Sequence, residues 1–331
     1  MDQQTLFDAI EPKVMGAIAD RAREVADGDR PTDLIKAAVA VGSVPILLGA
    51  LAASAPAQAA NNAVLSVLRY ALLLENLENQ FYRGVIGASG SPFASAFAPV
   101  RAKFASVAGV GSTILPTLQL LSQHETAHVA LLETVIQSGF QTAPDKYDPA
   151  QTFDFTGART VGGSASGPFY QATQDVGFLL AGTQGFEDTG VRAYKGQAAV
   201  LMGSTYLTPA LQIHALEARH AARIRRLRRL IDPTNTNVRY SGTVKGGGLT
   251  AAGGTLPANV QAAFAAIYAG EDNTTQTVNN GADASINAAT LPNPYGGDPT
   301  LAFDEPLGAA DVVKIVQNFV IPNVPSLSGL A

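Results

Sequence analysis

Two short motifs in this 331-residue chain have the composition and spacing of metal ligands. In each motif a histidine follows a glutamate by three residues: Glu125 with His128, and Glu217 with His220. Because three residues are close to one turn of an α-helix, the carboxylate and the imidazole of each motif project from the same helix face. Both groups bind divalent transition metals, so each of two helices can offer a metal two ligands.

A second pattern, a glutamate followed seven residues later by a tyrosine, precedes each motif. The pairs are Glu75 with Tyr82 and Glu187 with Tyr194, and a basic residue and a glycine follow both tyrosines. The chain therefore contains the same pattern twice, which implies two halves related by a pseudo-two-fold axis. Four such helices facing inward would bring together four carboxylates and two imidazoles, the ligand set of di-iron and di-manganese proteins built on four-helix bundles.

These spacings predict one dinuclear metal centre. Its six predicted ligands are Glu75, Glu125, His128, Glu187, Glu217 and His220. Glu125 and Glu217 are expected to bridge the two metals, and the other four side chains to bind one metal each. Tyr82 and Tyr194 would lie on the same face as their glutamates, where each can hydrogen-bond a ligand carboxylate or pass an electron. An ordinary place in the core is an equally good interpretation of both tyrosines.

The apolar surroundings of the lone glutamates support this interpretation. Glu75 follows three leucines and Glu187 follows Phe186. A buried carboxylate is costly unless it is paired or bound to a metal, so four around one point require cations. Glu78, one turn from Glu75, could replace it, but only Glu75 has the spacing to a tyrosine that recurs at Glu187. The alternative, that some of these glutamates lie at the surface of the bundle, stays open.

All four histidines of the chain lie in or near the two motifs. His124 lies one turn before His128 and could be an extra ligand or could orient one, but a half-exposed polar residue is the favoured interpretation. His214 is six residues from His220 and points to a different side of its helix. No metal role is expected for His214.

The ligand types favour iron or manganese over zinc, which usually takes fewer and softer ligands. The predicted cofactor is two iron ions, with manganese as the alternative, and the predicted partners are dioxygen or peroxide. The chain contains no cysteine, which excludes thiolate zinc sites, iron–sulfur centres and disulfides. A net charge of −5 argues against a nucleic-acid partner, and the arginines near residue 225 are interpreted as favourable to a helix C-terminus.

Hydrophobic periodicity predicts an all-α protein. The predicted helices cover residues 3–26, 32–54, 62–84, 112–139, 169–200, 208–231, 257–269 and 308–319. Gly84 and Gly139 are expected to end two of them, and Ser112 and Thr208 to cap two others. The predicted organisation is a helical and apolar extension over 1–58, a four-helix bundle with a long crossover over 59–232, and an irregular, Gly- and Asn-rich extension over 233–331 that packs on the bundle.

The N-terminal segment carries the expectation about location. An apolar run from Ala37 to Ala53 precedes a small-residue stretch, residues 57–59, that resembles a signal-peptidase site. The charged residues before it argue against export, and Pro45 interrupts the run. An exported or envelope-associated protein with membrane contact through this segment is favoured over a cytoplasmic one. A retained helical extension is the alternative, and a homo-oligomer is left open.

The segment from Leu72 to Tyr82 resembles the first core helix of the ferritin-like superfamily, and within it the bacterial ferritin-like domain proteins related to plant desiccation-related proteins. The segments 268–276 and 303–307 resemble the C-terminal part of those proteins, so the resemblance covers about residues 35–320. It implies a ferritin-like four-helix bundle with a di-iron centre and a role in stress or desiccation tolerance. The long C-terminal extension argues against a storage cage, and the absence of cysteine argues against a rubrerythrin.

The sequence thus predicts a ferritin-like dinuclear metal protein that oxidises ferrous iron or reduces peroxide in stress protection. The spacing of Glu217 and His220 differs from that of the manganese catalases, which rank lower. The alternative function is a non-catalytic structural, assembly or desiccation-protection protein that retains the bundle but not turnover.

Overall fold

The structure, a computed structural model, describes residues 55–159, 167–231, 258–278, 284–292 and 299–321. These residues all belong to one compact unit, Ser54–Ala331. The helices predicted over 3–26 and 32–54, and with them the apolar run, lie outside the described residues. None of the helices in the described ranges combines the length and the apolar character that a membrane crossing requires.

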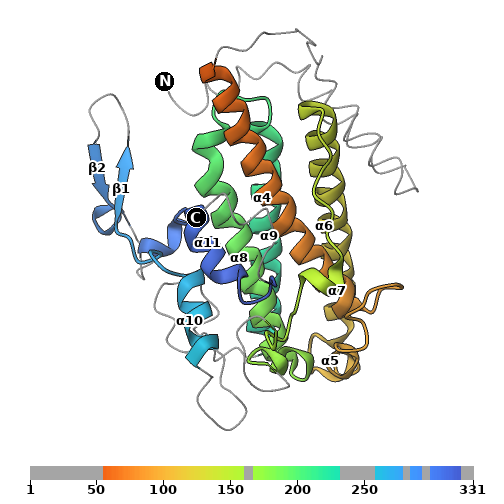
Figure 1. Ribbon diagram of the computed structural model, residues 1–331. Helices are drawn as coiled ribbons and strands as arrows, with labels where there is room; N and C mark the ends of the chain where they lie inside the picture. Colours follow the sequence, from red (N-terminus) through yellow and green to blue (C-terminus); the bar gives the residue numbers. More distant parts are fainter. Residues whose placement is uncertain (1–54, 160–166, 232–257, 279–283, 293–298, 322–331) are drawn as a thin grey trace, which may run out of the picture. The chain divides into compact units, whose positions relative to one another are not determined.

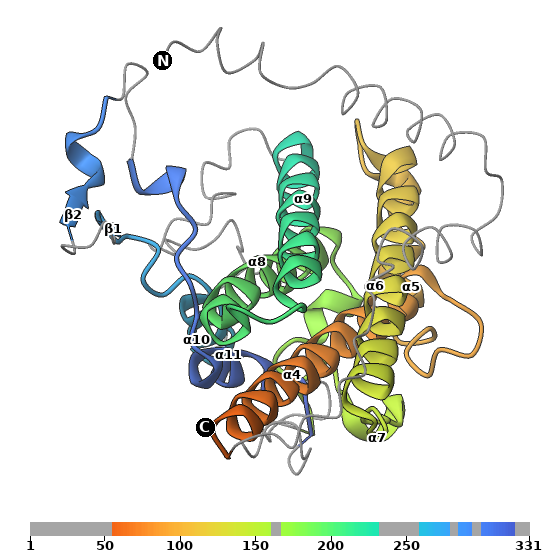
Figure 2. The same ribbon diagram turned by 90° about the horizontal axis from the view of Figure 1, so that it is seen from above.

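Four long helices form a bundle (Figures 1 and 2). They are α4 (Ala55–Ile86), α6 (Gly111–Phe140), α8 (Val176–Leu201) and α9 (Leu207–Ile231). α4 packs along α6 and α8 along α9, while α4 also contacts α8 and α6 contacts α9. Fully buried aliphatic side chains such as Leu72, Leu118, Leu179 and Ile224 fill the interior. The prediction of an all-α, four-helix fold is confirmed.

The ends of the bundle helices differ from the predicted ones. α8 begins at Val176, not at residue 169, because Tyr170–Thr173 forms a separate 3-10 helix, η2, and the Asp175 carboxylate accepts a hydrogen bond from the backbone N–H of Phe178. α6 begins at Gly111, and its N-terminus has no side-chain cap, so the expected cap at Ser112 is wrong. α9 begins at Leu207, which places Thr208 inside its first turn.

α4 and α6 continue past Gly84 and Gly139, although both glycines are predicted helix ends. α4 ends before Gly87, whose φ of +75° lies in the left-handed region. Gly84 instead permits close packing, since a Cβ there would lie 2.7 Å from the Cβ of Phe93. Gly196, the equivalent glycine of the second half, lies against the backbone carbonyl of Leu307. The repeated glycine therefore marks a place where another segment crosses the helix.

The connections run along the bundle and meet the C-terminal segment. The connection from α4 to α6 contains α5 (Ala98–Arg101) and the 3-10 helix η1 (Phe104–Ser106). The long crossover from α6 to α8 contains α7 (Pro149–Thr152). Beyond α7, Phe153 pairs with Val320 in an antiparallel bridge. The crossover is thus held on the bundle by a segment near the C-terminus.

The C-terminal extension contains more regular structure than its composition predicts. Its helices are α10 (Ala258–Ile267) and α11 (Ala309–Val316), both packed on α8. β1 (Thr275–Val278) and β2 (Ala284–Asn287) form an antiparallel hairpin, followed by the 3-10 helices η3 (Ala288–Thr290) and η4 (Pro299–Ala302). The sequence did not predict the hairpin, because each strand has only four residues and lies in a Gly- and Asn-rich stretch.

Arg192 of α8 joins this extension to the bundle. Its Nε lies 2.9 Å from Oε1 of Glu271, and both side chains are almost fully buried. The guanidinium group also donates to the backbone carbonyls of Glu305, Ile267 and Ala269. A buried charge that is paired and fully hydrogen-bonded is costly to disrupt, so this arginine fixes α10 and the segment around Glu305 against α8.

Candidate metal centre

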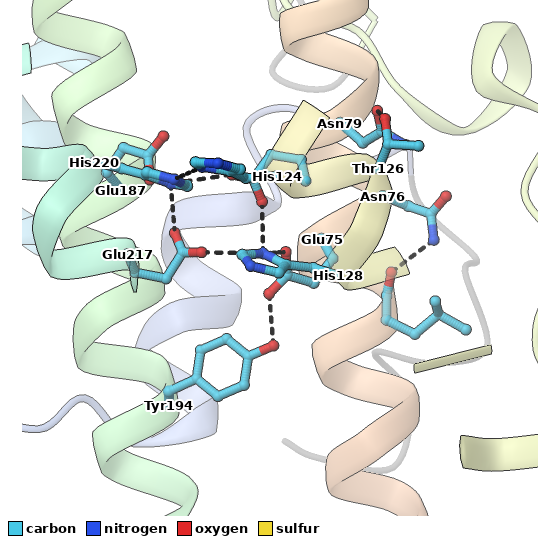
Figure 3. A network of polar contacts seen from close by, with 12 residues as sticks. Glu75, Asn76, Asn79, His124, Thr126, His128, Glu187, Tyr194, Glu217 and His220 are labelled. Carbon is cyan, nitrogen blue, oxygen red and sulfur yellow. Dashed lines mark hydrogen bonds and ion pairs between the residues drawn. The ribbon is translucent and has the colours of Figure 1, made fainter. Parts of the chain in front are cut away.

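The six predicted ligands meet near the middle of the four long helices, and Figure 3 shows five of them, Glu75, His128, Glu187, Glu217 and His220. α4 supplies Glu75, α6 supplies Glu125 and His128, α8 supplies Glu187, and α9 supplies Glu217 and His220. The most exposed of the six, His128, is 6 % exposed. The alternative arrangement, with some glutamates at the surface of the bundle, is therefore wrong.

The ligand atoms form two overlapping groups. One group contains Glu75, Glu125, His128 and Glu217; the other contains Glu125, Glu187, Glu217 and His220. Within each group the ligand atoms lie within 4.8 Å of one another, and Glu125 and Glu217 belong to both groups. This sharing is the geometry that two bridging carboxylates would give to a pair of metal ions.

The two imidazoles face the shared carboxylates through the same ring atom. Nδ1 of His128 lies 3.0 Å from Oε2 of Glu75 and 3.1 Å from Oε2 of Glu125. Nδ1 of His220 lies 3.1 Å from Oε2 of Glu187 and 3.1 Å from Oε1 of Glu125. The two oxygens of Glu125 thus point to different imidazoles, as a bridging group requires.

Several carboxylate oxygens at the centre lack hydrogen bonds. Oε1 of Glu125 and both oxygens of Glu217 are buried and make no hydrogen bond of good geometry with the described residues, although Nδ1 of His220 lies 3.1 Å from Oε1 of Glu125 and Nδ1 of His128 lies 3.3 Å from Oε1 of Glu217. Buried carboxylate oxygens without donors are unfavourable unless a cation occupies the space they face. The donor set and these orphaned oxygens fit metal ions between α4, α6, α8 and α9.

The pKa shifts show the same imbalance of charge. Burial raises the pKa of Glu217 well above its usual range, and the neighbouring carboxylates of Glu125 and Glu187 raise it further. Burial also raises the pKa of Glu125 to about 7. For His220, burial alone would lower the pKa, but the carboxylates of Glu187 and Glu125 raise it to about 9. Without metal, Glu125, Glu217 and His220 therefore hold protons more readily than the same groups do in water.

The two tyrosines bind the glutamates of the opposite half. The hydroxyl of Tyr82 on α4 donates to Oε1 of Glu187 on α8. The hydroxyl of Tyr194 on α8 donates to Oε1 of Glu75 at 2.5 Å (Figure 3). This reciprocity arises because α4 and α8 run in opposite directions, so a residue seven positions after one glutamate reaches the other. Each hydroxyl fixes one carboxylate oxygen and leaves the second oxygen facing an imidazole.

His124 has a contact that its favoured interpretation does not include. It is partly exposed, as expected, but its Nδ1 lies 2.9 Å from Nε2 of His220, and the two rings are nearly parallel. The only sequence signal for a role of His124 was its spacing of one turn from His128, but its partner in the structure is His220, on a different helix. His214, for which no metal role is expected, lies outside both ligand groups, and its Nδ1 is 2.9 Å from the carbonyl oxygen of Val191.

Glu78 is a fifth buried carboxyl group beside the centre, 5 % exposed. It belongs to neither ligand group, and burial raises its pKa well above the usual range. The equivalent position on α8 is Gly190, where a Cβ would lie 3.1 Å from Oε2 of Glu217 and 3.5 Å from Oε1 of Glu78. Glu78 therefore has no counterpart on α8, because Gly190 has no side chain. The pseudo-two-fold symmetry is broken at this position.

Four inward-facing helices around a buried carboxylate and imidazole cluster define a class of protein, the helical bundle with a site compatible with two metal ions. The model of one protein family, the ferritin-like domain, matches residues 63–229, half of the chain. The chain belongs to the ferritin-like family. No curated protein and no solved structure matched it.

Proposed function

We propose that this protein binds two iron ions in the bundle and oxidises ferrous iron with dioxygen or hydrogen peroxide as the electron acceptor. The observation that carries the proposal is the sharing of Glu125 and Glu217 between two ligand groups, each with its own imidazole and its own further carboxylate. A site for a single cation would not need this duplication. Four carboxylates with two imidazoles favour iron, with manganese as the alternative.

Two ferrous ions would supply two electrons, with which hydrogen peroxide and two protons give two water molecules, or dioxygen and two protons give hydrogen peroxide. The residues of the chain position the ligands and exclude water. The hydroxyls of Tyr82 and Tyr194 hold the two terminal carboxylates in one orientation. The burial of all six ligands strengthens their electrostatic interaction with a cation.

His124 supports the tautomer that metal binding needs. If Nδ1 of His220 is to bind a metal, the proton of that ring must lie on Nε2, which is the atom 2.9 Å from Nδ1 of His124. Burial, together with the neighbouring His220 and His128, lowers the pKa of His124 to about 4. His124 is then neutral near pH 7, and its Nδ1 can accept the proton of His220 in a hydrogen bond.

Such a reaction would remove both an oxidant and the ferrous iron that converts it into radicals. This fits protection during oxidative stress or drying, for which the likeness of the segment 72–82 to desiccation-related proteins is the support. We propose an exported or envelope-associated location, supported by the apolar run from Ala37 to Ala53.

Metal analysis with oxidation kinetics on the purified full-length chain tests the proposal. After anaerobic loading with ferrous iron we expect about two iron ions per chain, because the two ligand groups each provide one position. Addition of oxygen or peroxide should then produce ferric absorbance faster than in protein-free solution. Fewer than about one ion per chain would overturn the proposal and favour the structural alternative.

A matched pair of variants connects the result to this centre. The double variant Glu125→Gln, Glu217→Gln removes both shared carboxylates and is expected to lose binding and oxidation. Glu133→Gln on α6 changes a partly exposed glutamate that pairs with Lys146 and should behave as wild type. Retained oxidation in the double variant would place the reaction elsewhere.

Tyr82→Phe and Tyr194→Phe are each expected to weaken metal binding about tenfold, and by similar factors, because each removes one hydrogen bond to a terminal carboxylate. Competition with a chromophoric chelator measures the affinity. Tyr170→Phe, at a position 42 % exposed, is the control for loss of a tyrosine hydroxyl. An effect at only one of the two buried tyrosines would contradict the equivalence of the two halves.

A further inference from the structure

A small cavity lies between the four long helices, on the α9 N-terminal side of the metal centre. Its volume is about 30 Å³. Apart from Gln197 and three tyrosines, the residues that line it are apolar, among them Leu68, Ala71, Leu132 and Ala210. No part of the ligand set described above lines this cavity.

Tyr194 connects the wall of the cavity with the ligands. Tyr194 forms part of the cavity wall, and its hydroxyl donates to Oε1 of Glu75 at 2.5 Å (Figure 3). Ala71 and Leu74, also in the wall, lie on α4 within one turn of Glu75. A molecule in the cavity is therefore in contact with residues that touch or flank a terminal ligand.

The cavity also has a side that reaches solvent. Leu131 and Val135 of α6 and Gln197 of α8 line it and are only partly buried. The inner wall, by contrast, contains fully buried side chains such as Tyr70, 1 % exposed, whose hydroxyl has no hydrogen-bond partner among the described residues. The cavity thus extends from a partly exposed rim to the interior next to the centre.

The lining selects the chemistry of the occupant. A water molecule needs two to four polar partners, and the buried hydroxyl of Tyr70 offers it one, whereas small apolar molecules such as xenon enter largely apolar cavities without any. Hydrogen peroxide carries two O–H donors and would lose most of its hydrogen bonds here. Dioxygen is small and apolar and needs none.

We infer that this cavity binds dioxygen and delivers it to the metal centre, so that dioxygen and peroxide reach the centre by different routes. The inference rests on the proposed function for its use of dioxygen, but the binding of dioxygen in the cavity does not depend on iron.

Methyl NMR of the metal-free protein under oxygen tests the binding. Dissolved dioxygen is paramagnetic, so the methyl signals of Leu68, Ala71 and Leu132 should relax faster than those of surface residues. Ala210→Val adds two methyl groups to the cavity wall and should abolish the excess relaxation. Ala215→Val places the same substitution at an exposed position of α9 and should not change it. No excess relaxation in the wild type would overturn the inference.

Oxidation kinetics of the iron-loaded protein test the delivery. In Ala210→Val the KM for dioxygen should rise at least about tenfold, since methylene-sized changes in apolar pockets have effects of this size, while peroxide-driven oxidation stays as in wild type. Equal losses with both oxidants would show that the substitution disturbs the centre and would overturn separate delivery. If the wild type oxidises iron with neither oxidant, the proposed function fails and delivery with it, and the NMR result then decides dioxygen binding by itself.

Discussion

A Glu217→Gln variant is expected to unfold at a higher temperature than the wild type when both are free of metal, and at a lower temperature when both are loaded with metal. The amide has the shape of the carboxyl group but no charge. Because burial and neighbouring carboxylates raise the pKa of Glu217 well above its usual range, the charged form of this group destabilises the metal-free folded state. Glutamine has no charge and avoids this cost.

The gain should appear in calorimetry with a chelator present as a rise in Tm of about 5–10 °C. In saturating metal the order reverses, because loss of a shared carboxylate should weaken metal binding at least about a hundredfold and binding to the folded state stabilises it. Glu133→Gln, in a pair at the surface where ion pairs contribute about 1 kcal/mol or less, should give no such crossing. A metal-free Glu217→Gln protein less stable than wild type would show that Glu217 already has a stabilising partner.

This reversal would mean that the metal-free centre destabilises the folded bundle. Five carboxyl groups are buried at the centre: those of the four glutamate ligands and that of Glu78. Their burial is unfavourable for folding, and only two imidazoles lie among the predicted ligands to balance their charge. Natural proteins accept such local conflicts where function needs them. The surrounding leucines, isoleucines and phenylalanines of the bundle provide the stability that this centre removes.

The metal-ligand candidates could be predicted from the sequence because their geometry is local. The three-residue spacing of Glu125 and His128 fixes their common face once the segment is helical, and the repeat at Glu217 and His220 makes chance unlikely to produce it. The contact of Tyr82 with Glu187 is not local. It depends on the opposite directions of α4 and α8, which no spacing within one helix contains.

The glycines and His124 show the same limit. Gly84 and Gly196 both follow a tyrosine of the repeat, and a glycine at that position is a reasonable helix end. Their role depends instead on Phe93 and Leu307, which approach from distant segments. The contact of His124 with His220 likewise joins side chains 96 positions apart, so its neighbour could not be read from its own helix.

The stabilisation that metal gives should grow as the pH rises from about 5 to 9. In the metal-free protein burial raises the pKa of Glu125 from 4.5 to about 7, and the carboxylates of Glu187 and Glu125 outweigh burial to raise the pKa of His220 from 6.5 to about 9. Between each pair of values the folded state holds a proton that the unfolded state has released, so metal-free stability falls with rising pH. Metal ions displace these protons, so metal affinity rises over the same range.

Calorimetry with and without manganese, which avoids oxidation of ferrous iron during the scan, measures the difference in Tm across this range. Glu125→Gln tests the lower window, because it removes the group whose pKa rises from 4.5 to about 7; it also removes one of the carboxylates that raise the pKa of His220, so the upper window should shift to lower pH. Its metal-free stability should therefore change less with pH below about 7 than that of the wild type. A metal-induced gain in Tm that is constant or shrinks with rising pH would show that metal does not take the place of these protons, and hence that it binds away from Glu125 and His220.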